Sequence, residues 1–433
     1  MAIDTLGANA LASNSVTSAK IAADAITTAK IANDAVTGAK IPSGAVVADI
    51  ADGGITTAKL ADDAVTSAKL GASAVDATAL ASNAVTTAKV SDGAVTQAKT
   101  TGVGKGKNLI INGNFQVFQK GSGGATAGNN TYAKTDRFKY FLSGVTTTQD
   151  QQEFTPGQTD VPGEPRYYMR NILASNSGAG DYSIVAQHIE DVTTCAGQEV
   201  TVSFYAKSSV NGNKVAVEFS QSFGTGGSSR VTSAQTGDTG AVVTLTTSWA
   251  KYTVTTTIDS ISGKTLGPSN TSFLELYLWM SAGSNYSRAN GIGNQSGNFD
   301  FANIQLELGA QATDFEHRSF GEELQLCMRY YYKLGGDTAY QTVNTVVNFT
   351  GGTMLGHYQH PVQMRAAPTI TKTGNWSTLG GDTTVGQNVS ADQNGPKTVQ
   401  LGFSGGSGGT SGRAATLRWA NNINANLQFS AEL

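Results

Sequence analysis

Apolar residues recur every five positions through roughly the first hundred residues of the chain. A mostly Val series alternates with a mostly Ile and Leu series, so each repeat unit is ten residues long. This period fits neither the about 3.6 residues of a helical turn nor the alternation of a β-strand, and it excludes a heptad coiled coil. The chain must therefore bend once in every unit to keep its apolar side chains on one side.

The polar residues of the repeat indicate how this bend is made. Asp, Asn or Gly separates the units, and these residues tolerate the positive φ of a tight turn. Thr follows most members of the Val series and precedes Ala-Lys, where it can cap a short helical turn. We therefore interpret each unit as one helical turn followed by one tight turn.

A single unit buries too little apolar surface to offset the roughly 1–2 kcal/mol of backbone entropy per residue. Sister chains are expected to supply the missing core, and three chains around one axis form the simplest closed arrangement. The expected seam of this homotrimer comprises Val16, Ile21, Ile26, Ile31, Val36, Ile41, Ile55, Leu60, Val65, Leu70, Val85 and Val90. The alternative is a disordered linker, although such linkers do not keep an apolar register over many units.

Residues 108 to about 316 show short alternating segments separated by Gly, Asn and Ser. This pattern, without a long helix, predicts an antiparallel β-sandwich. The predicted strands are Asn108–Phe118, Phe138–Phe141, Ser183–His188, Glu199–Lys207, Lys214–Ser220, Trp249–Ile258, Thr271–Met280 and Asp300–Leu308.

A helix is predicted to open the last part of the chain. Ser319 and Glu322 have the spacing of a capping box, and Leu324, Cys327 and Met328 follow at helical spacing. Cys327 is therefore expected in a core and not as a nucleophile.

Composition excludes several classes of protein. Only 14% of the residues are charged, and 29 Lys and Arg against 32 Asp and Glu leave no basic run for a line of phosphates, so we expect no nucleic acid partner. The sequence contains no stretch of about 18 apolar residues, so we expect no membrane insertion. The first residues lack the basic segment and the long apolar segment of a secretory signal. We expect folding in a cytoplasm, with Cys195 and Cys327 as buried thiols and no disulfide.

Catalytic chemistry has little support in the sequence. The four histidines, His188, His317, His357 and His360, are scattered, and no nucleophile elbow lies between a strand and a helix. Asp and Glu are spread singly, whereas a glycan hydrolase needs a pair of carboxylates. We therefore expect no catalytic residues, no cofactor and no bound metal.

Three parts of the chain resemble bacteriophage fibre proteins. The repeats, such as Asp24–Ala32, resemble head-fibre and tail-fibre stalks, in some of which three chains supercoil. Residues 108 to about 316 resemble the jelly-roll carbohydrate-binding-type domains of such fibres, and the later segments resemble a terminal fibre domain. The segments that carry the second and third resemblances are Asn108–Phe115, Val202–Ser208, Thr247–Trp249, Ile304–Glu307, Ala312–Glu316, then Glu322–Tyr331, Pro361–Thr369 and Ala431–Leu433. Related sugar-binding modules often hold calcium with acids where this chain has Gln116 and Ala302-Asn303, which argues against calcium here.

The resemblance implies a mainly β protein with an N-terminal repetitive stalk. We divide it into 1–12 (virion anchor), 13–100 (trimeric supercoiled stalk), 101–107 (hinge), 108–318 (jelly-roll sandwich) and 319–433 (smaller, distal, mainly β domain with a helix at its start).

Strand parity suggests where a sugar could bind. Leucines 274, 276 and 278 are expected in the core, and aromatic rings beside charges on an outward face can hold the apolar face and the hydroxyls of a sugar. The Gly-rich segment Gly402–Gly412 and the nearby Trp376 are candidates for a receptor-facing tip. The predicted sugar-binding residues are Tyr205, Lys207, Glu275, Tyr277, Trp279 and Trp376. The alternative is that this face packs against a sister subunit or the next domain.

These observations predict a structural fibre of a phage virion, assembled in the bacterial cytoplasm, that displays a β-sandwich for adsorption to host surface glycans. Its expected partners are itself as a homotrimer, a phage head or tail protein through the N-terminus, and host cell-surface polysaccharide. A purely structural virion decoration protein and a glycan hydrolase are the alternatives.

Overall fold

The computed structural model describes most of the 433-residue chain, namely residues 11–41, 60–61, 64–70, 85–86, 90, 108–121, 124–233, 242–268, 271–350, 352–379, 383–384 and 388–433. The chain forms two compact units, Met1–Ser91 and Asp92–Leu433. Within the described residues, no helix is both long and apolar enough to span a membrane.

The described repeats of the first unit each form a single 3-10 helical turn and a tight turn. Asn14, Asp24 and Asp34 adopt φ values of 62°, 62° and 61°, which confirms that Asp and Asn supply the turns. Thr17 and Thr27 precede a helical turn as predicted, but their side chains make no capping hydrogen bond. The helical turns are η1 (Ser18–Lys20), η2 (Thr28–Lys30), η3 (Gly38–Lys40) and η5 (Ser67–Lys69).

The predicted seam residues of the repeats are open to solvent in the single chain. Their exposed fractions range from 36% at Ile41 to 57% at Ile26 and Val85, while Val90 is partly buried and Ile55 lies outside the described residues. The Lys side chains fold back along the chain, as where Lys30 Nζ donates to the Ala25 carbonyl at 2.9 Å. A periodic row of uncovered apolar side chains is what a self-associating stalk needs, and trimerisation stays a prediction.

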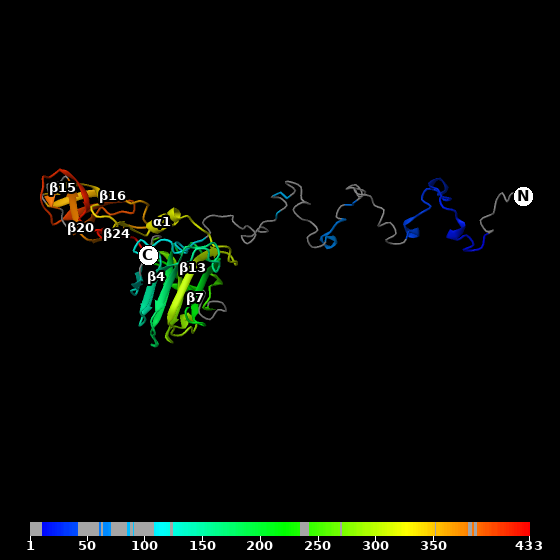
Figure 1. The fold of residues 1–433 in the computed structure, drawn as a ribbon, viewed down its shortest axis with the longest axis horizontal. Coiled ribbons are helices and arrows are strands. Elements are labelled where there is room, and N and C mark those ends of the chain that lie inside the picture. Colours follow the sequence, from blue (N-terminus) through cyan, green and yellow to red (C-terminus); the bar gives the residue numbers. More distant parts are fainter. Residues whose placement is uncertain are drawn as a thin grey trace. The chain divides into compact units, whose positions relative to one another are not determined.

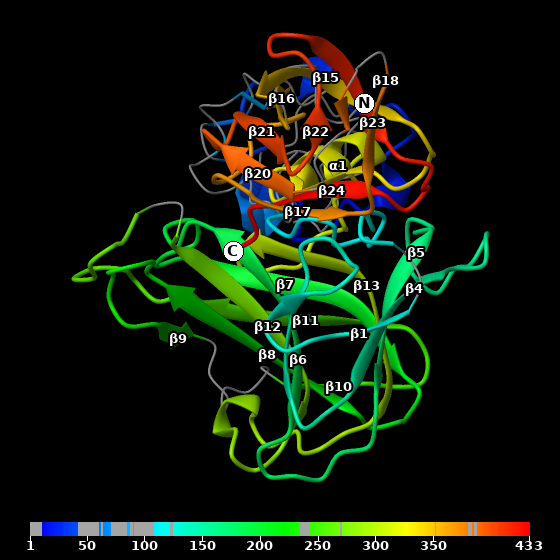
Figure 2. The same ribbon diagram turned by 90° about the vertical axis from the view of Figure 1, so that its left-hand side faces the viewer.

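Two antiparallel sheets form a β-sandwich at the start of the second unit (Figure 1, Figure 2). Sheet A contains, in spatial order, β1 (Ala125–Thr126), β4 (Thr147–Glu153), β5 (Tyr167–Leu173), β13 (Gly297–Leu308), β7 (Glu199–Ser208) and β11 (Ala250–Thr257). Sheet B contains β10 (Val242–Thr244), β8 (Lys214–Ser222), β12 (Phe273–Ala282), β6 (Tyr182–Glu190), β3 (Lys139–Ser143) and β2 (Thr131–Tyr132), with β9 (Val231–Ser233) beside β8. Many consecutive strands, such as β7 and β8 or β12 and β13, change sheet, which is connectivity of the jelly-roll type.

One hydrophobic core lies between the two sheets. Alternate residues of β7, such as Val202 and Phe204, meet alternate residues of β12, such as Leu274 and Leu276, and all four are almost fully buried. This alternation confirms the predicted sandwich and the inward direction of the leucines.

The predicted strand Asn108–Phe118 is wrong. Asn112 and Phe115 have φ values of 62° and 56°, and the Asn112 side chain bridges the backbone of Val117 by hydrogen bonds of 2.8 and 2.9 Å, so the segment loops. Gly113 packs against the Ile304 carbonyl so closely that a Cβ would lie 2.0 Å from that oxygen. The segment is buried beside β13 as an irregular loop.

The C-terminal domain begins with helix α1 (Phe320–Met328), which has the predicted capping box between Ser319 and Glu322. Cys327 and Cys195 are both fully buried, as predicted. The strands of this domain form a three-stranded sheet of β14 (Tyr331–Gly335), β24 (Asn426–Ser430) and β17 (Thr369–Thr373), a six-stranded sheet of β18 (Trp376–Leu379), β23 (Ala414–Trp419), β15 (Thr342–Thr350), β16 (Thr353–Gln359), β21 (Thr398–Ser404) and β20 (Asn388–Asp392), and the pair β19 (Thr383–Thr384) and β22 (Ser407–Gly408).

Trp376 lies in the core of this domain and not at a receptor-facing tip. Its ring is only 4% exposed and packs 4.1 Å from the ring of Trp419 and 4.9 Å from that of Phe403. Strand β18 pairs with β23, which turns the Trp376 ring inward, and Gly402 itself belongs to β21. The prediction that Trp376 binds sugar is therefore wrong.

A buried arginine joins the sandwich to the C-terminal domain. Arg137 is 1% exposed and forms an ion pair with Glu432. Its guanidinium lies 3.4 Å from the centre of the Tyr330 ring and donates to the His188 carbonyl at 2.6 Å. These contacts, made by residues far apart in sequence, hold the two β-domains together.

Candidate functional site

The predicted residues of β12 point away from the sandwich core but are not exposed. Glu275, Tyr277 and Trp279 are 0%, 6% and 2% exposed. Tyr277 and Trp279 belong to a second, small apolar cluster, to which the loop around Tyr286 and Ile292 contributes. The prediction that these three residues form an open sugar-binding face is therefore wrong, because parity gives the direction of a side chain and not what covers it.

The polar groups on this covered face of sheet B form hydrogen bonds and ion pairs with one another. Glu275 contacts His188 and Arg230 and accepts a hydrogen bond of 2.6 Å from the Tyr277 hydroxyl. Burial opposes the charge of Glu275, but the hydrogen bond and charge of His188 lower its pKa. Glu218 on β8 lies diagonally across from Glu275. Burial raises the pKa of Glu218, although its partner Arg288 acts to lower it. Both carboxylates are 0% exposed, whereas the side chains of Arg230 and Arg288 are 42% and 45% exposed, so this face pairs buried acids with partly exposed arginines.

Tyr205 and Lys207 lie instead on the outer face of sheet A, where both are partly exposed. A row of alternating charge crosses four strands at this level, because Asp150 pairs with Arg170, Arg170 with Asp300 and Asp300 with Lys207 in the strand registers. Arg170 holds Asp300 with two parallel hydrogen bonds of 2.8 Å, which raise the pKa of the guanidinium. This row fixes charged groups at defined positions on the sheet.

An aromatic cluster adjoins the charged row. The ring centres of Phe154, Tyr168 and Trp249 lie 4.8 to 5.2 Å apart. The Lys207 ammonium lies 5.0 Å from the centre of the Trp249 ring. Phe154 and Trp249 are partly exposed, so the cluster offers ring surface next to a cation.

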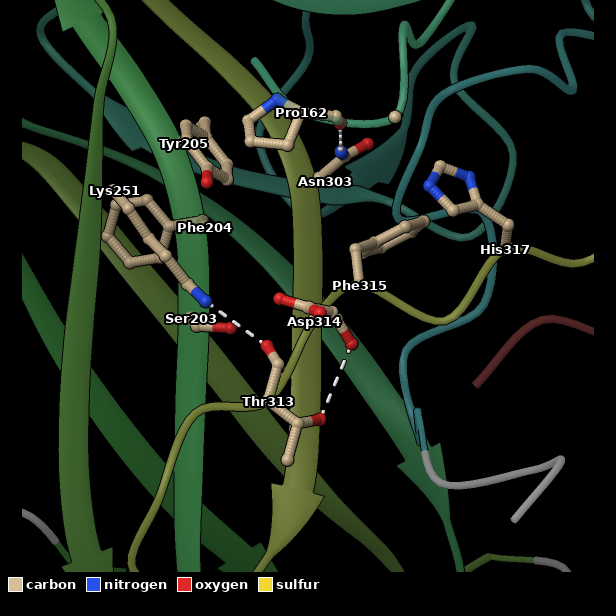
Figure 3. A pocket seen from close by; sticks show the side chains of 11 residues that line it. Pro162, Ser203, Phe204, Tyr205, Lys251, Asn303, Thr313, Asp314, Phe315 and His317 are labelled. Atoms are coloured by element: carbon tan, nitrogen blue, oxygen red, sulfur yellow. Dashed lines mark hydrogen bonds between the residues drawn. The ribbon is translucent and has the colours of Figure 1, made fainter. Parts of the chain in front are cut away.

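A pocket of about 280 Å³ opens beside Tyr205 on the same face. Figure 3 shows Tyr205 and Lys251 on one side of it, Pro162 and Asn303 at one end, and His317 on the other side. Asn303 occupies a bulge of β13 and has a φ of 49°. A β-bulge changes the direction in which a side chain leaves the strand, and here it accompanies the placement of Asn303 at the pocket.

The lining of the pocket has both donors and an acceptor. Lys251 Nζ donates to the Thr313 carbonyl at 3.1 Å, and Asn303 Nδ2 donates to the Pro162 carbonyl at 3.5 Å. Asn303 Oδ1 is buried without a hydrogen-bond partner among the described residues. Burial lowers the pKa of His317, which favours its neutral ring.

His317 also lines a neighbouring pocket of about 360 Å³ with Arg166, Tyr167 and Phe320. The Phe320 side chain is 55% exposed. The two pockets together extend the partly apolar surface from sheet A to the start of α1.

Sequence reasoning missed several residues of this face, among them Tyr168, Arg170 and Trp249. The parity that placed Lys207 outward applies equally to Asp300, and the run Tyr167–Leu173 has an apolar alternation that could have been read as a strand.

Among the described residues, no three His, Cys, Asp or Glu side chains are grouped as metal ligands.

No protein family and no curated protein matches this sequence. Among solved structures, the chain is similar to a family 11 carbohydrate-binding module from Clostridium thermocellum in complex with a β-1,3-1,4-mixed-linked tetrasaccharide (13% identity, 46% of this chain and 99% of that one, TM-score 0.26). It is also similar to a putative sugar binding protein from Bacteroides thetaiotaomicron (17% identity, 47% and 100%, TM-score 0.27). A third similar structure is the enzymatically active domain of tailspike protein 4 from bacteriophage CBA120 (13% identity, 47% and 22%, TM-score 0.27).

Proposed function

We propose that the sandwich binds a host cell-surface polysaccharide on the outer face of sheet A. The observation that carries this proposal is the partly exposed group of Tyr205, Trp249 and Lys207 beside the pocket of about 280 Å³. Aromatic rings stack on the apolar face of a pyranose, and fixed charges and amides take up its hydroxyls.

In the same proposal the chain is a non-enzymatic fibre of a bacteriophage virion, and its repeats form a trimeric stalk. The support is the apolar register of the repeats, whose described members are uncovered in the single chain, together with the resemblance of the sequence to phage fibres. A purely structural decoration protein would share the stalk but would need no sugar-binding face.

Affinity measurements against an array of bacterial surface polysaccharides test the proposal. The full chain should bind at least one glycan, and Tyr205→Ala should weaken that binding while Tyr340→Ala, a substitution of an exposed ring in the C-terminal domain, should not. Binding to no glycan would favour the decoration protein. Release of reducing sugar from a bound polysaccharide would favour the hydrolase.

A further inference from the structure

A third pocket, of about 360 Å³, lies at the junction of the sandwich and the C-terminal sheet of β14, β24 and β17. Three lysines line it: Lys120 and Lys134 from loops of the sandwich and Lys333 from β14. Tyr132 and Tyr331 complete much of the wall. The pocket shares no lining residue with the two pockets beside sheet A.

Strand alternation explains why polar residues of the C-terminal domain face this pocket. Tyr332 and Leu334 of β14 pack into the hydrophobic core of the domain, as does Leu427 of β24. Lys333 is therefore turned to the opposite face, directly across the ladder from Gln428. The core on one side fixes the position of the Lys333 ammonium on the other.

The three ammonium groups have no ion-pair partner among the described residues. The nearest acids already have partners: Asp136 accepts hydrogen bonds of 2.7 and 2.9 Å from Gln119, and Glu432 pairs with Arg137. Burial also raises the pKa of Asp136 to about 7, which weakens its negative charge near neutrality. Burial lowers the pKa of Lys120, against the raising effects of Glu432 and Asp136.

The remaining polar groups of the wall satisfy one another. The Tyr331 hydroxyl donates to Gln428 Oε1 at 3.0 Å, and Gln428 Nε2 donates to Asn426 Oδ1 at 3.1 Å. Lys120 Nζ lies 4.3 Å from the centre of the Tyr331 ring and 5.4 Å from that of Tyr132. The pocket thus offers ammonium donors beside aromatic rings, and its amide acceptors are occupied.

We infer that this pocket binds an oxyanion, the carboxylate or phosphate group of an acidic saccharide. Three lysines that form no ion pair among the described residues line this one pocket and supply the attraction, and hydrogen bonds from charged donors to an oxyanion are stronger than neutral ones. The adjacent tyrosine rings suit the carbon skeleton that carries the anion. The inference is independent of sugar binding on sheet A.

Calorimetric titration of the full chain at low salt with glucuronate, inorganic phosphate and glucose tests this inference. At least one anion should bind and the neutral glucose should not, and the preferred anion distinguishes a carboxylate from a phosphate ligand. Lys134→Gln and Lys333→Gln should each weaken anion binding roughly tenfold, as expected for loss of one charged hydrogen bond.

Lys251→Gln, which removes an equal charge from the pocket beside sheet A, is the matched control and should leave anion affinity unchanged. The inference is overturned if neither anion binds, or if a Lys134→Gln, Lys333→Gln double variant binds the anion as tightly as the wild type. Trp249→Ala, which probes the sheet A face, should not affect anion binding, so failure of the two proposals can be told apart.

Discussion

The indole nitrogen of Trp279 donates a hydrogen bond of 2.8 Å to Glu218 of the neighbouring strand β8. Arg288 approaches the same carboxylate, with a hydrogen bond of 2.8 Å from its Nε atom. Trp279 and Glu218 are 2% and 0% exposed. The outer face of sheet B is thus a second covered cluster of the sandwich, in which buried carboxylates are paired with partly exposed arginines.

Truncation of Trp279 should therefore damage the fold. Trp279→Ala removes a buried ring and a partner of a buried carboxylate, so we expect a loss of about 3–5 kcal/mol in the free energy of unfolding. Trp249→Ala, at a partly exposed ring, should cost on the order of 1 kcal/mol. Urea denaturation of both variants measures the difference, and equal losses would contradict the assignment of the two faces.

The junction arginine gives a second stability prediction. Glu432→Ala leaves the buried Arg137 guanidinium without its carboxylate, which should cost about 3–5 kcal/mol. The matched control is Glu153→Ala at the exposed pair with Arg166, where both side chains are more than half exposed and the cost should stay below about 1 kcal/mol. Similar denaturation midpoints for the two variants would show that the junction contributes little.

Asp136 predicts a pH dependence of stability. Burial raises its pKa from 3.8 to about 7, against the lowering effects of Lys120 and of the hydrogen bonds from Gln119. Between these two pH values the folded state binds more protons than the unfolded state, so this group makes the unfolding free energy fall as pH rises from about 4 to about 7.

Asp136→Asn should remove this contribution, so the variant's stability relative to the wild type should be higher at pH 8 than at pH 5. Denaturation at both pH values provides the comparison. A difference between the proteins that does not change with pH would mean that the Asp136 carboxyl titrates normally.

The stalk register can be tested by two adjacent substitutions. Ile31→Asp would place like charges together in the proposed apolar seam and should open the assembly locally. Lys30→Asp should be tolerated, because Lys30 lies outside the seam series, with its Nζ on the Ala25 carbonyl. Protease cleavage within residues 20–40 compares them, and equal resistance would favour the disordered-linker alternative.

The fold could be predicted where apolar residues alternate and not where buried residues are polar. Strands such as Glu199–Ser208 were visible because Val, Phe and Ala occupy every second position. The strand Thr147–Glu153 was missed because its inward residues include the polar residues Thr147 and Gln149. Both are buried, and hydrogen bonds satisfy their polar groups. Asn108–Phe118 looked like a strand, but its left-handed Asn112 makes it a loop.

The site could be predicted only in part. Parity placed Tyr205 and Lys207 on an outward face correctly, since the sheet period decides that direction. The same reasoning could not see that the loop around Tyr286 covers Trp279, because that contact joins segments that the pattern of one strand does not relate. The prediction for Trp376 was wrong for the same reason, because its packing on Trp419 joins two segments that are far apart in the sequence.

The most direct test of the central claim is the glycan affinity of Trp249→Ala compared with that of the wild type, with folding checked by the denaturation midpoint. We predict that the variant keeps nearly the wild-type midpoint and loses at least about tenfold in affinity, because its ring supplies stacking surface beside Lys207 on sheet A. Unchanged glycan affinity in a folded Trp249→Ala variant would contradict the account.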